Sequence, residues 1–361
     1  MRGIGAQFRN IVRRYSIASY TGKQNANGKF TVPIIEGDGI GPEISAAVKK
    51  IFGAANAPIE WVPVDVTPSI VDGVQVFPKR TVDLINEHKV ALKGPLATPI
   101  GKGHVSLNLT LRRTFNLFAN VRPCKSIEGY NTAYSGVNTV LIRENTEGEY
   151  SGIEHAISPG VIQSIKLITA KASERVCEYA FNYANEIGKK KVLVVHKASV
   201  LKLGDGLFVS SAEKVAKKFP DIELCYELID NTCLKMVQDP SYYEDFVMVM
   251  PNLYGDIMSD LCSGLIGGLG LTPSGNMGID VSIFEAVHGS APDIAGKNMA
   301  NPTALLLSSV MMLRYMNLPE YADKIEKAVL ETLASGKDNI TKDLKGNATT
   351  EKFTSEVISR L

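Results

Sequence analysis

Strand-like and helix-like patterns alternate along most of this chain, and this alternation restricts the folds that it can adopt. Short apolar runs that favour strands occur at residues 29–35, 90–93, 139–142, 191–195 and 246–250. Patterns typical of amphipathic helices occur at residues 42–52, 173–187, 212–219, 303–316 and about 325–333. Such alternation is typical of α/β proteins with a largely parallel sheet. Asn301 and Pro302 are predicted to be the N-cap and first residue of the helix at 303–316.

The first apolar run leads into a glycine-rich segment that resembles a nucleotide-binding fingerprint. The segment reads Glu-Gly-Asp-Gly-Ile-Gly-Pro-Glu at residues 36–43. Its spacing is G-x-G-x-G-P and differs from the G-x-G-x-x-G of dinucleotide-binding folds. The single acidic residue Asp65 is weak support for a ribose contact. We therefore predict a tight turn that needs unusual backbone angles, and not a Rossmann site.

The bulk composition excludes several classes of protein. The 361 residues include 39 basic and 38 acidic side chains, so no overall field favours nucleic acid or a membrane surface. No apolar run approaches the roughly 18 residues of a membrane span. The five cysteines are scattered and form no C-x-x-C pair, which indicates reduced thiols and argues against a structural zinc site.

The N-terminus differs from the rest of the chain in composition. It has no acidic residue before Glu36, and its four arginines within the first 14 residues alternate with apolar side chains. This composition is typical of a mitochondrial transit peptide. Residues 1–28 are therefore predicted to be a transit peptide and a disordered N-terminal segment, outside the folded domains. A disordered basic tail is the alternative.

A pair of aspartates follows the apolar run at 246–250. Asp256 and Asp260 are four residues apart, so on a helix they share one face and can converge on a single cation. The preceding Pro251-Asn252 turn sets them at a strand-to-helix edge. Carboxylate oxygens suit Mg²⁺ or Mn²⁺, and a site with few protein ligands leaves room for substrate oxygens. A solvated helix face is the simpler interpretation of this spacing taken alone.

Several polar segments carry groups that can bind a small anion. Asn108 and Arg112 lie one helical turn apart in the motif SLNLTLR, which begins at Ser106. Arg122 and Arg143 each adjoin an apolar strand-like run. Arginine suits the bidentate grip of carboxylates better than lysine does. Any one of these arginines alone is more simply a surface ion pair.

Three further residues are candidates for proton transfer or metal binding. Tyr150 follows the run that contains Arg143, and beside cations its hydroxyl can act as a proton donor. Lys197 lies where the run at 191–195 ends, and its pKa is expected to fall near a metal and other cations, as a general base requires. Asp230 follows a strand-like run at 223–229 and can supply a third carboxylate.

The segment from His288 to Gly296 has the composition of a loop that closely approaches a flat ligand. Glycine and small residues permit that approach, and backbone N–H groups are available as donors. Asp293 is placed to accept hydrogen bonds from a ribose diol and to repel a 2′-phosphate, which favours NAD over NADP.

Together these segments resemble the β-decarboxylating dehydrogenase family, and within it the mitochondrial NAD-dependent isocitrate dehydrogenases. The resemblance extends from Phe30 to the C-terminus and rests on the motifs GDGIGPE, SLNLTLR, IRENTEGEYSG, HKAS, PNLYGDIMSD and HGSAPDIAG. It implies an α/β two-domain fold like that of isocitrate and isopropylmalate dehydrogenases, with a mixed parallel sheet and no Rossmann fold. Residues 29–117 and 267–361 would form a large discontinuous nucleotide-binding domain. Residues 118–266 would form a small domain with the metal site and the dimer interface.

The resemblance also implies roles for individual residues. Isocitrate would be bound by Ser106, Asn108, Arg112, Arg122 and Arg143. Mg²⁺ or Mn²⁺ would be held by Asp230, Asp256 and Asp260. Lys197 and Tyr150 would be the acid/base pair. The NAD contacts would be Thr98, His288, Gly289, Asp293, Ile294 and Asn301. In this family the lysine and one aspartate come from a neighbouring subunit, so a lone protomer is expected to be inactive.

The resemblance favours one function over two alternatives. It implies oxidative decarboxylation of isocitrate to 2-oxoglutarate in the tricarboxylic acid cycle, in the mitochondrial matrix, by the catalytic subunit of a hetero-oligomer with a paralogous regulatory subunit and allosteric control. Because Asp256, Asp260 and Tyr150 are all present, the chain resembles a catalytic subunit. A regulatory, non-catalytic subunit is one alternative. 3-Isopropylmalate dehydrogenase is the other, although Ser106 and Asn108 suit a carboxylate arm better than an isopropyl group.

Overall fold

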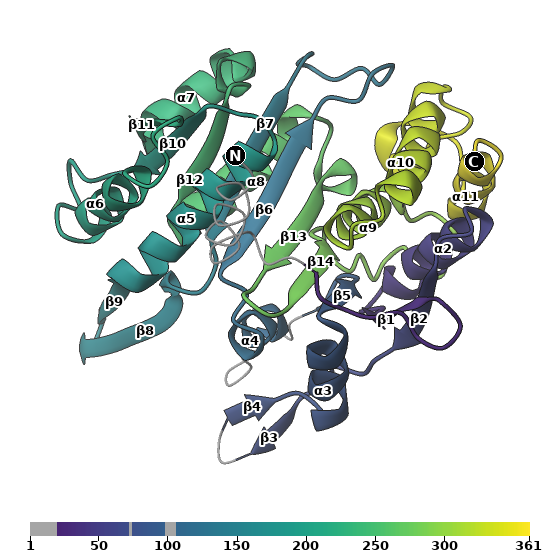
Figure 1. Ribbon diagram of the computed structural model, residues 1–361, viewed down its shortest axis with the longest axis horizontal. Helices are drawn as coiled ribbons and strands as arrows, with labels where there is room; N and C mark the ends of the chain where they lie inside the picture. Colours follow the sequence, from purple (N-terminus) through teal and green to yellow (C-terminus); the bar gives the residue numbers. More distant parts are fainter. Residues whose placement is uncertain (1–19, 72–73, 98–105) are drawn as a thin grey trace, which may run out of the picture.

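A ten-stranded mixed sheet forms the centre of the molecule (Figure 1). The computed structural model describes residues 20–71, 74–97 and 106–361. The strand order within them is β11-β10-β12-β7-β6-β13-β14-β5-β1-β2. The strands of this sheet are β1 (Phe30–Ile35), β2 (Ile59–Pro63), β5 (Val90–Lys93), β6 (Ala119–Lys125), β7 (Asn138–Glu144), β10 (Lys191–His196), β11 (Glu223–Leu228), β12 (Phe246–Met250), β13 (Pro273–Met277) and β14 (Ser282–Ala286).

Parallel pairing dominates both ends of the sheet, and antiparallel pairing joins them in the middle. β13 runs antiparallel to both β14 and β6, and β6 runs antiparallel to β7. The other paired neighbours are parallel. The sheet is therefore mixed, as predicted, and its order differs from that of a Rossmann fold. The β6–β13 pair connects strands of the predicted small domain to strands of the predicted large domain, so one sheet runs through both.

Helices cover both faces of the sheet. They are α2 (Gly41–Ala54), α3 (Lys79–His88), α4 (Leu107–Thr114), α5 (Ala170–Glu186), α6 (Gly204–Ala216), α7 (Ile229–Gln238), α8 (Asn252–Leu265), α9 (Thr303–Tyr315), α10 (Pro319–Ala334) and α11 (Thr350–Ile358). Short 3₁₀ turns lie at η1 (Pro240–Tyr243), η2 (Leu269–Leu271) and η3 (Lys342–Leu344).

The two faces of the sheet are packed differently. Alternate strand residues point to opposite faces, so Val247 and Val249 of β12 join one apolar cluster while Met248 and Met250 join another. The first face carries a single large cluster with α2, α5, α6, α9, α10 and α11. The second face carries two separate clusters, one under α7 and α8 and one under α3 and α4. The strip between those two clusters is where the polar residues described below lie.

Most predicted elements are present, with shifts at their ends. The glycine-rich turn is confirmed, because Gly37 and Gly39 both have positive φ and a Cβ on Gly37 would lie 2.1 Å from the carbonyl oxygen of Pro95. The helix predicted at 212–219 begins earlier, at Gly204. The predicted cap of α9 is wrong by one position. Pro302 is the N-cap residue, and Asn301 caps the helix by accepting a hydrogen bond from the Thr303 N–H at 3.0 Å.

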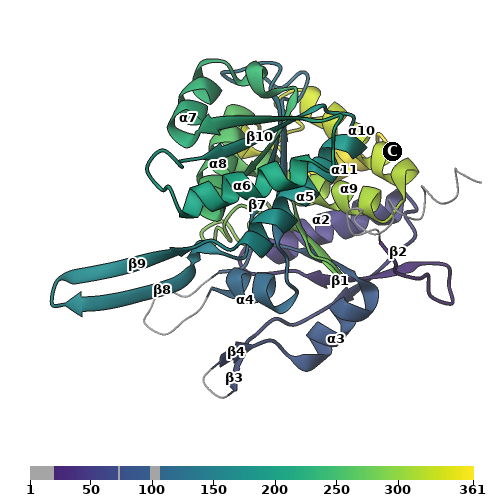
Figure 2. The same cartoon turned by 60° about the vertical axis from the view of Figure 1, so that its left-hand side comes forward.

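A long hairpin, β8 (Gly148–Ser158) with β9 (Val161–Leu167), projects from the body of the molecule (Figure 2). A shorter hairpin joins β3 (Ser69–Val71) to β4 (Val74–Val76). The long hairpin exposes an unusual set of apolar side chains, which are Ile153, Ile157, Val161, Ile162, Ile165 and Leu167. Such a surface typically marks a contact with another chain.

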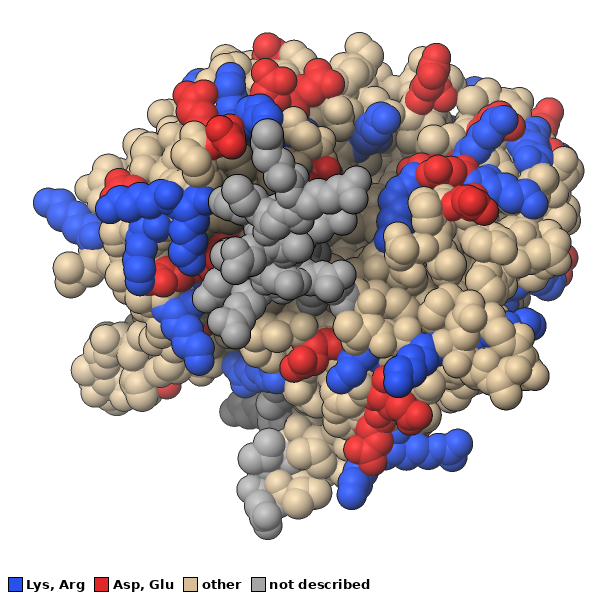
Figure 3. Space-filling model, in the orientation of Figure 1, with Lys and Arg blue, Asp and Glu red and all other residues tan. Residues whose placement is uncertain are grey.

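The surface carries both signs of charge. Basic and acidic side chains are interspersed over the face shown in Figure 3, as the nearly balanced composition predicts. Across the parts of the chain that the structure describes, every helix is too short or too polar to span a bilayer.

The central strand β7 offers a direct test of the packing. The Ile142 side chain is fully buried in the large cluster, and we expect Ile142→Ala to lower the free energy of unfolding by about 2–5 kcal/mol because it leaves a cavity. Ile279→Ala is the control, since Ile279 is exposed, and a change within about 0.5 kcal/mol is expected. Denaturant unfolding of both variants measures the difference. Equal destabilisation by both substitutions would contradict this description of the core.

Candidate active site

The predicted aspartate pair lies on a helix that begins directly after a buried strand. β12 ends at Met250, Pro251 is the N-cap residue, and α8 begins at Asn252. Asp256 and Asp260 then fall on the helix face that also carries Asn252, because residues four apart are neighbours on a helix. The face points toward the polar strip of the sheet, as the contacts with β6 and β7 residues show.

Arg143 is the most buried cation of the cluster. Its side chain, near the end of β7, is 1% exposed. One guanidinium nitrogen, Nη1, forms an ion pair with Asp256, while Nε and Nη2 donate to the Asn252 side-chain oxygen at 2.9 and 2.7 Å. A buried guanidinium with partners on every nitrogen is held in one orientation.

Arg122 and Arg112 complete a group of three arginines. Arg122, on β6, donates through Nε to the Asn120 oxygen at 3.1 Å, and its Nη1 lies 3.9 Å from a carboxylate oxygen of Asp260. This Nη1 is buried and has no hydrogen-bond partner within the described residues. Arg112, on α4, is half-buried and lies near both other arginines. Burial, followed by the repulsion of Arg143, lowers the pKa of Arg112 to about 10, although Glu285 and Asp256 oppose this.

Ser106 and Asn108 lie at the start of the same helix. Ser106 is the N-cap residue of α4, and Asn108 is in its first turn, so the predicted one-turn spacing from Asn108 to Arg112 is helical as expected. Asn108 Oδ1 is buried without a hydrogen-bond partner in the part of the chain described. An unpaired buried polar atom is costly unless a ligand or water satisfies it.

A chain of buried polar residues, here called the polar belt (Lys93, Asn120, Asn276 and Glu285), supports the arginines. Lys93 Nζ lies 3.0 Å from a Glu285 oxygen, and Asn276 donates to the other Glu285 oxygen at 2.6 Å. Asn120 in turn donates to Asn276 Oδ1 at 3.0 Å and accepts from Arg122. The polar belt thus connects β5, β14, β13 and β6 across the strip between the two smaller apolar clusters.

The polar belt was not predicted from the sequence, although one signal in it points to buried charges. Lys93 and Glu285 are lone charges inside short apolar runs, VALK and SIFEA. A charge in a buried strand requires a partner. The sequence therefore indicates that Lys93 and Glu285 each need a charged partner. It does not indicate that these two residues, 192 positions apart, pair with each other.

Tyr150 lies beside the aspartates, near the start of β8. Its hydroxyl donates a hydrogen bond to the Asp256 carboxylate, and its ring centroid lies 5.1 Å from the Arg143 guanidinium carbon. Burial, and then the hydrogen bond to Asp256, raises the pKa of Tyr150. The phenol is therefore protonated near neutral pH, as a proton donor must be.

Lys197 and Asp230 are paired with each other, and no hydrogen bond or ion pair joins either side chain to the described residues of this cluster. Lys197 follows β10, Asp230 is in the first turn of α7, and Lys197 Nζ lies 2.7 Å from an Asp230 oxygen. The ion pair lowers the pKa of Asp230. Among the described residues, His, Cys, Asp and Glu side chains form no group of three that could hold a metal ion. Within one protomer, the three predicted metal ligands are therefore not brought together.

Four of the predicted NAD contacts line one cavity. His288, Gly289, Ile294 and Asn301 surround a space of about 560 Å³, together with Lys342 and Asp343. Burial lowers the pKa of His288, and Asn301 donates to Asp343 at 2.9 Å. Asp293 is exposed in the same loop. Thr98 lies outside the described residues.

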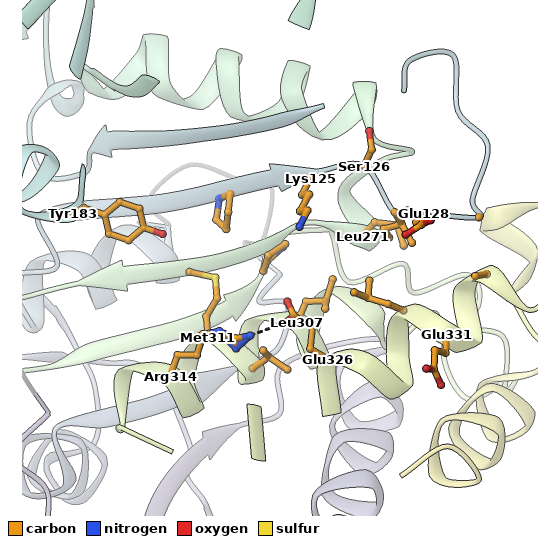
Figure 4. A pocket seen from close by; sticks show the side chains of 17 residues that line it. Lys125, Ser126, Glu128, Tyr183, Leu271, Leu307, Met311, Arg314, Glu326 and Glu331 are labelled. Carbon is orange, nitrogen blue, oxygen red and sulfur yellow. Dashed lines mark hydrogen bonds and ion pairs between the residues drawn. The ribbon is translucent and has the colours of Figure 1, made fainter. Parts of the chain in front are cut away.

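A second cavity, of about 680 Å³, lies on the other face of the sheet, between α5 and the α9–α10 pair (Figure 4). It is lined mainly by apolar side chains, with an Arg314–Glu326 ion pair at its edge. It contains none of the predicted site residues. Adjacent residues of β6 face opposite sides, so Pro123 lines this cavity while Arg122 points into the arginine cluster.

This geometry suits one class of ligand. The site combines two buried arginines and the half-buried Arg112 with unpaired polar atoms on Asn108 and Arg122, which favours a small molecule with several carboxylates. Two carboxylates one turn apart and a protonated tyrosine adjoin it. The fold and site define an α/β protein with an arginine cluster suited to a polycarboxylate and, separately, a cavity of small-molecule size.

Comparisons with known proteins identify the family. The sequence model described as isocitrate/isopropylmalate dehydrogenase matches residues 31–360. The chain is 66% identical over 348 residues to isocitrate dehydrogenase (NAD) subunit 2, mitochondrial, of Kluyveromyces lactis, covering 96% of this chain and 95% of that protein. It is 58% identical over 336 residues to isocitrate dehydrogenase (NAD) subunit alpha, mitochondrial, of Homo sapiens, covering 92% and 91%.

A solved structure of an isocitrate dehydrogenase is also similar to this chain. Isocitrate dehydrogenase from Methylococcus capsulatus matches with a TM-score of 0.84 at 44% identity, covering 91% of this chain and 98% of that chain. The chain therefore belongs to the isocitrate/isopropylmalate dehydrogenase family. The family and the mixed α/β fold expected from the sequence motifs are both confirmed.

The buried Lys93–Glu285 ion pair should make the free energy of unfolding depend on pH in acid. Burial alone would raise the pKa of Glu285, but Lys93, Arg112 and Asn276 together lower it from 4.5 to about 2. A lowered folded-state pKa stabilises the protein above the unfolded-state value, and this stabilisation is lost as pH falls toward about 2. Protonation of Glu285 alone should therefore lower the free energy of unfolding by about 2 kcal/mol as the pH falls from about 5.5 to about 3.

Denaturant unfolding across this pH range measures the effect. The double variant Lys93→Met/Glu285→Gln replaces both charges and should show a flatter dependence on pH. The double variant Lys214→Met/Glu174→Gln is the matched control, because it removes an ion pair with a 65%-exposed lysine. If the two double variants have the same acid dependence, Glu285 does not hold a depressed pKa.

Proposed function

We propose that this chain is the catalytic subunit of a hetero-oligomer that oxidises and decarboxylates isocitrate to 2-oxoglutarate with NAD in the mitochondrial matrix. Relatives 58–66% identical to it are named mitochondrial NAD isocitrate dehydrogenase subunits, which supports the reaction, the cofactor and the location. Those names leave open whether a subunit is catalytic or regulatory. That distinction depends on the residues of this chain.

The observation that carries the proposal is the cluster of three arginines, two of them buried, with neighbouring polar atoms left unpaired. Arg112, Arg122 and Arg143 lie together, with Arg122 and Arg143 beside the Asn252–Asp260 face of α8, and buried atoms of Arg122 and Asn108 have no protein partner among the described residues. Isocitrate carries three carboxylates, and guanidinium groups bind carboxylates in bidentate geometry. A polar, cationic cleft also disfavours the apolar isopropyl arm of 3-isopropylmalate.

The residues present fit a divalent metal. Asp256 and Asp260 offer hard oxygen donors on one helix face, beside the cleft where substrate oxygens would complete the ligand set. We assign the third carboxylate to a neighbouring subunit, at the position equivalent to Asp230, because within a protomer Asp230 pairs with Lys197. Bound there, Mg²⁺ or Mn²⁺ would supply Lewis-acid polarisation of the substrate oxygen next to the breaking bond.

The chain's own residues would divide the remaining work. The arginines, with Ser106 and Asn108, fix the carboxylates of isocitrate. Lys197, reaching across a subunit contact, helps remove the C2 hydroxyl proton while hydride passes to NAD⁺. Tyr150, whose pKa is raised by burial and by Asp256, then delivers a proton to the enolate carbon left by CO₂.

The proposed NAD site is the cavity lined by His288, Gly289, Ile294 and Asn301. Its volume of about 560 Å³ lies in the range of small-molecule sites. Asp293, exposed in the same loop, is placed to accept from a ribose diol and to repel a 2′-phosphate.

Exposed apolar surfaces support assembly with another chain. Apart from the β8–β9 hairpin, Leu234 and Val237 of α7 and Ile257 of α8 are each about half exposed. These helices flank the metal-binding aspartates and Asp230. A partner that covers them would bring its own counterparts of Lys197 and Asp230 toward this cleft, and we propose a paralogous regulatory subunit as that partner.

Replacing the aspartate pair distinguishes a catalytic from a regulatory subunit. In the assembled enzyme, Asp256→Asn/Asp260→Asn should lower kcat for isocitrate by at least about 100-fold, because a catalytic metal supplies several kcal/mol of transition-state stabilisation. NADH absorbance measures the rate. Asp221→Asn/Asp280→Asn, at two exposed positions, is the matched control and should keep full activity. Activity retained by the first variant would show that this chain is not the catalytic centre.

A shared site makes activity depend on assembly. We expect chains separated as monomers by gel filtration to form no NADH from isocitrate, because Lys197 and Asp230 do not reach Asp256 and Asp260 within one protomer. Light scattering verifies the oligomeric state of each fraction, and reassembly at higher concentration is the control. Substantial turnover by a verified monomer would contradict the shared site.

A further inference from the structure

Asn252 is hydrogen-bonded to residues of the candidate site, although it was not among the predicted site residues. It is the first residue of α8, its side chain is 1% exposed, and its oxygen accepts two hydrogen bonds from Arg143, at 2.9 and 2.7 Å. Its amide nitrogen donates to the backbone carbonyl of Glu147 at 2.9 Å. One side chain thus holds both a substrate arginine and the loop that leads to Tyr150.

The first contact fixes the direction of the Arg143 guanidinium. With Nε and Nη2 both bound to Asn252, the remaining edge, at Nη1, is directed toward Asp256. No other described side chain is hydrogen-bonded to Nε or Nη2. Without Asn252 the guanidinium keeps the Asp256 contact and the Tyr150 ring, but Nε and Nη2 lose the acceptor that fixes their direction.

The backbone of α8 is fitted to the same arginine. A Cβ added to Gly255 would lie 2.4 Å from Arg143 Cγ, so the helix can pass the arginine only because position 255 is glycine. Asn252 and Gly255 lie on adjacent parts of the first helical turn. Together they form the part of α8 against which the Arg143 side chain packs.

The second contact fixes the loop before β8. Glu147 is followed by Gly148, whose φ is +77° and whose added Cβ would lie 3.2 Å from the Asn252 Cβ. Tyr150 follows two residues later and donates to Asp256. The carbonyl that Asn252 holds is therefore three residues from the proposed proton donor.

We propose that Asn252 is a positioning residue for the isocitrate site, which orients Arg143 toward the substrate and anchors the loop that carries Tyr150. The inference rests on the proposed function. Asn252 touches neither the nucleotide cavity nor, in this role, the substrate itself, so its loss should weaken the use of isocitrate and leave that of NAD unchanged.

Two substitutions at position 252 separate the contacts. Asn252→Leu keeps the approximate size and removes both contacts, whereas Asn252→Asp keeps the acceptor oxygen for Arg143 and removes the donor to Glu147. In the assembled enzyme, Asn252→Leu should raise the KM for isocitrate by about 10- to 100-fold, since displacing a binding group by about 1 Å can have effects of that size. Asn252→Asp should keep a KM for isocitrate near that of the unsubstituted enzyme. The KM for NAD should not change in either.

Two further variants distinguish this positioning role from a general disturbance of α8. Ser263→Ala removes a buried hydrogen bond within α8 (Ser263 Oγ to the Ser259 carbonyl, 2.7 Å) without approaching Arg143, and it should leave both KM values unchanged. Gly255→Ala displaces Arg143 while Asn252 stays intact, and it should raise the KM for isocitrate as Asn252→Leu does. It also provides the test if Asn252→Leu does not fold.

The outcomes are distinct. Assembled, unsubstituted enzyme that forms no NADH from isocitrate would refute the proposed function, and this inference with it. Active enzyme in which Asn252→Leu, or Gly255→Ala in its place, keeps a normal KM for isocitrate would refute only the positioning role. An equal rise in the KM for isocitrate in Asn252→Asp and Asn252→Leu would overturn the orienting of Arg143, because Asn252→Asp keeps the acceptor oxygen for that arginine.

Discussion

The burial of several guanidinium groups against one face of the sheet is the constraint on which the rest of the structure depends. A buried charge is tolerated only when partners replace the water that it has lost. Here Asp256, Asp260 and Glu285 supply opposite charge, while Asn120, Asn252 and Asn276 supply oriented dipoles. The three arginines therefore retain their charge, and because their partners are rigid strands and a helix, they are also fixed in direction.

The packing of the sheet explains why this cluster lies where it does. One face carries a single large apolar cluster, but the other is divided into two clusters, under α7 and α8 and under α3 and α4. The polar belt occupies the strip between them, where β5, β14, β13, β6 and β7 present polar side chains in succession. The cleft is thus built on the antiparallel centre of the sheet, at the junction of the two predicted domains.

Local patterns predicted much of this arrangement. The run at 246–250, the Pro251 turn and the spacing of Asp256 and Asp260 placed a carboxylate pair at the start of a helix, and the structure has it there. The helical relation of Asn108 to Arg112 and the unusual glycine turn were likewise predictable, because each depends on residues within a few positions.

What could not be predicted depends on contacts between distant parts of the chain. Lys93 meets Glu285, and Asn252 meets both Arg143 and Glu147. Asn252 was predicted only as a turn residue, since nothing near it in the sequence shows that an arginine 109 positions earlier will lie against it. The separation of Lys197 and Asp230 from the other site residues also depends on tertiary and quaternary structure, which no spacing encodes.

The central claim is that this cleft oxidises isocitrate with NAD and needs a neighbouring subunit to do so. The most direct test is NADH formation by the purified chain, alone and co-expressed with a paralogous subunit, with isocitrate and Mg²⁺ and with 3-isopropylmalate or NADP⁺ as controls. We predict NADH from isocitrate in the co-expressed sample only. Turnover of 3-isopropylmalate without turnover of isocitrate would contradict the assigned substrate, and full activity of the chain alone would contradict the need for a second kind of subunit.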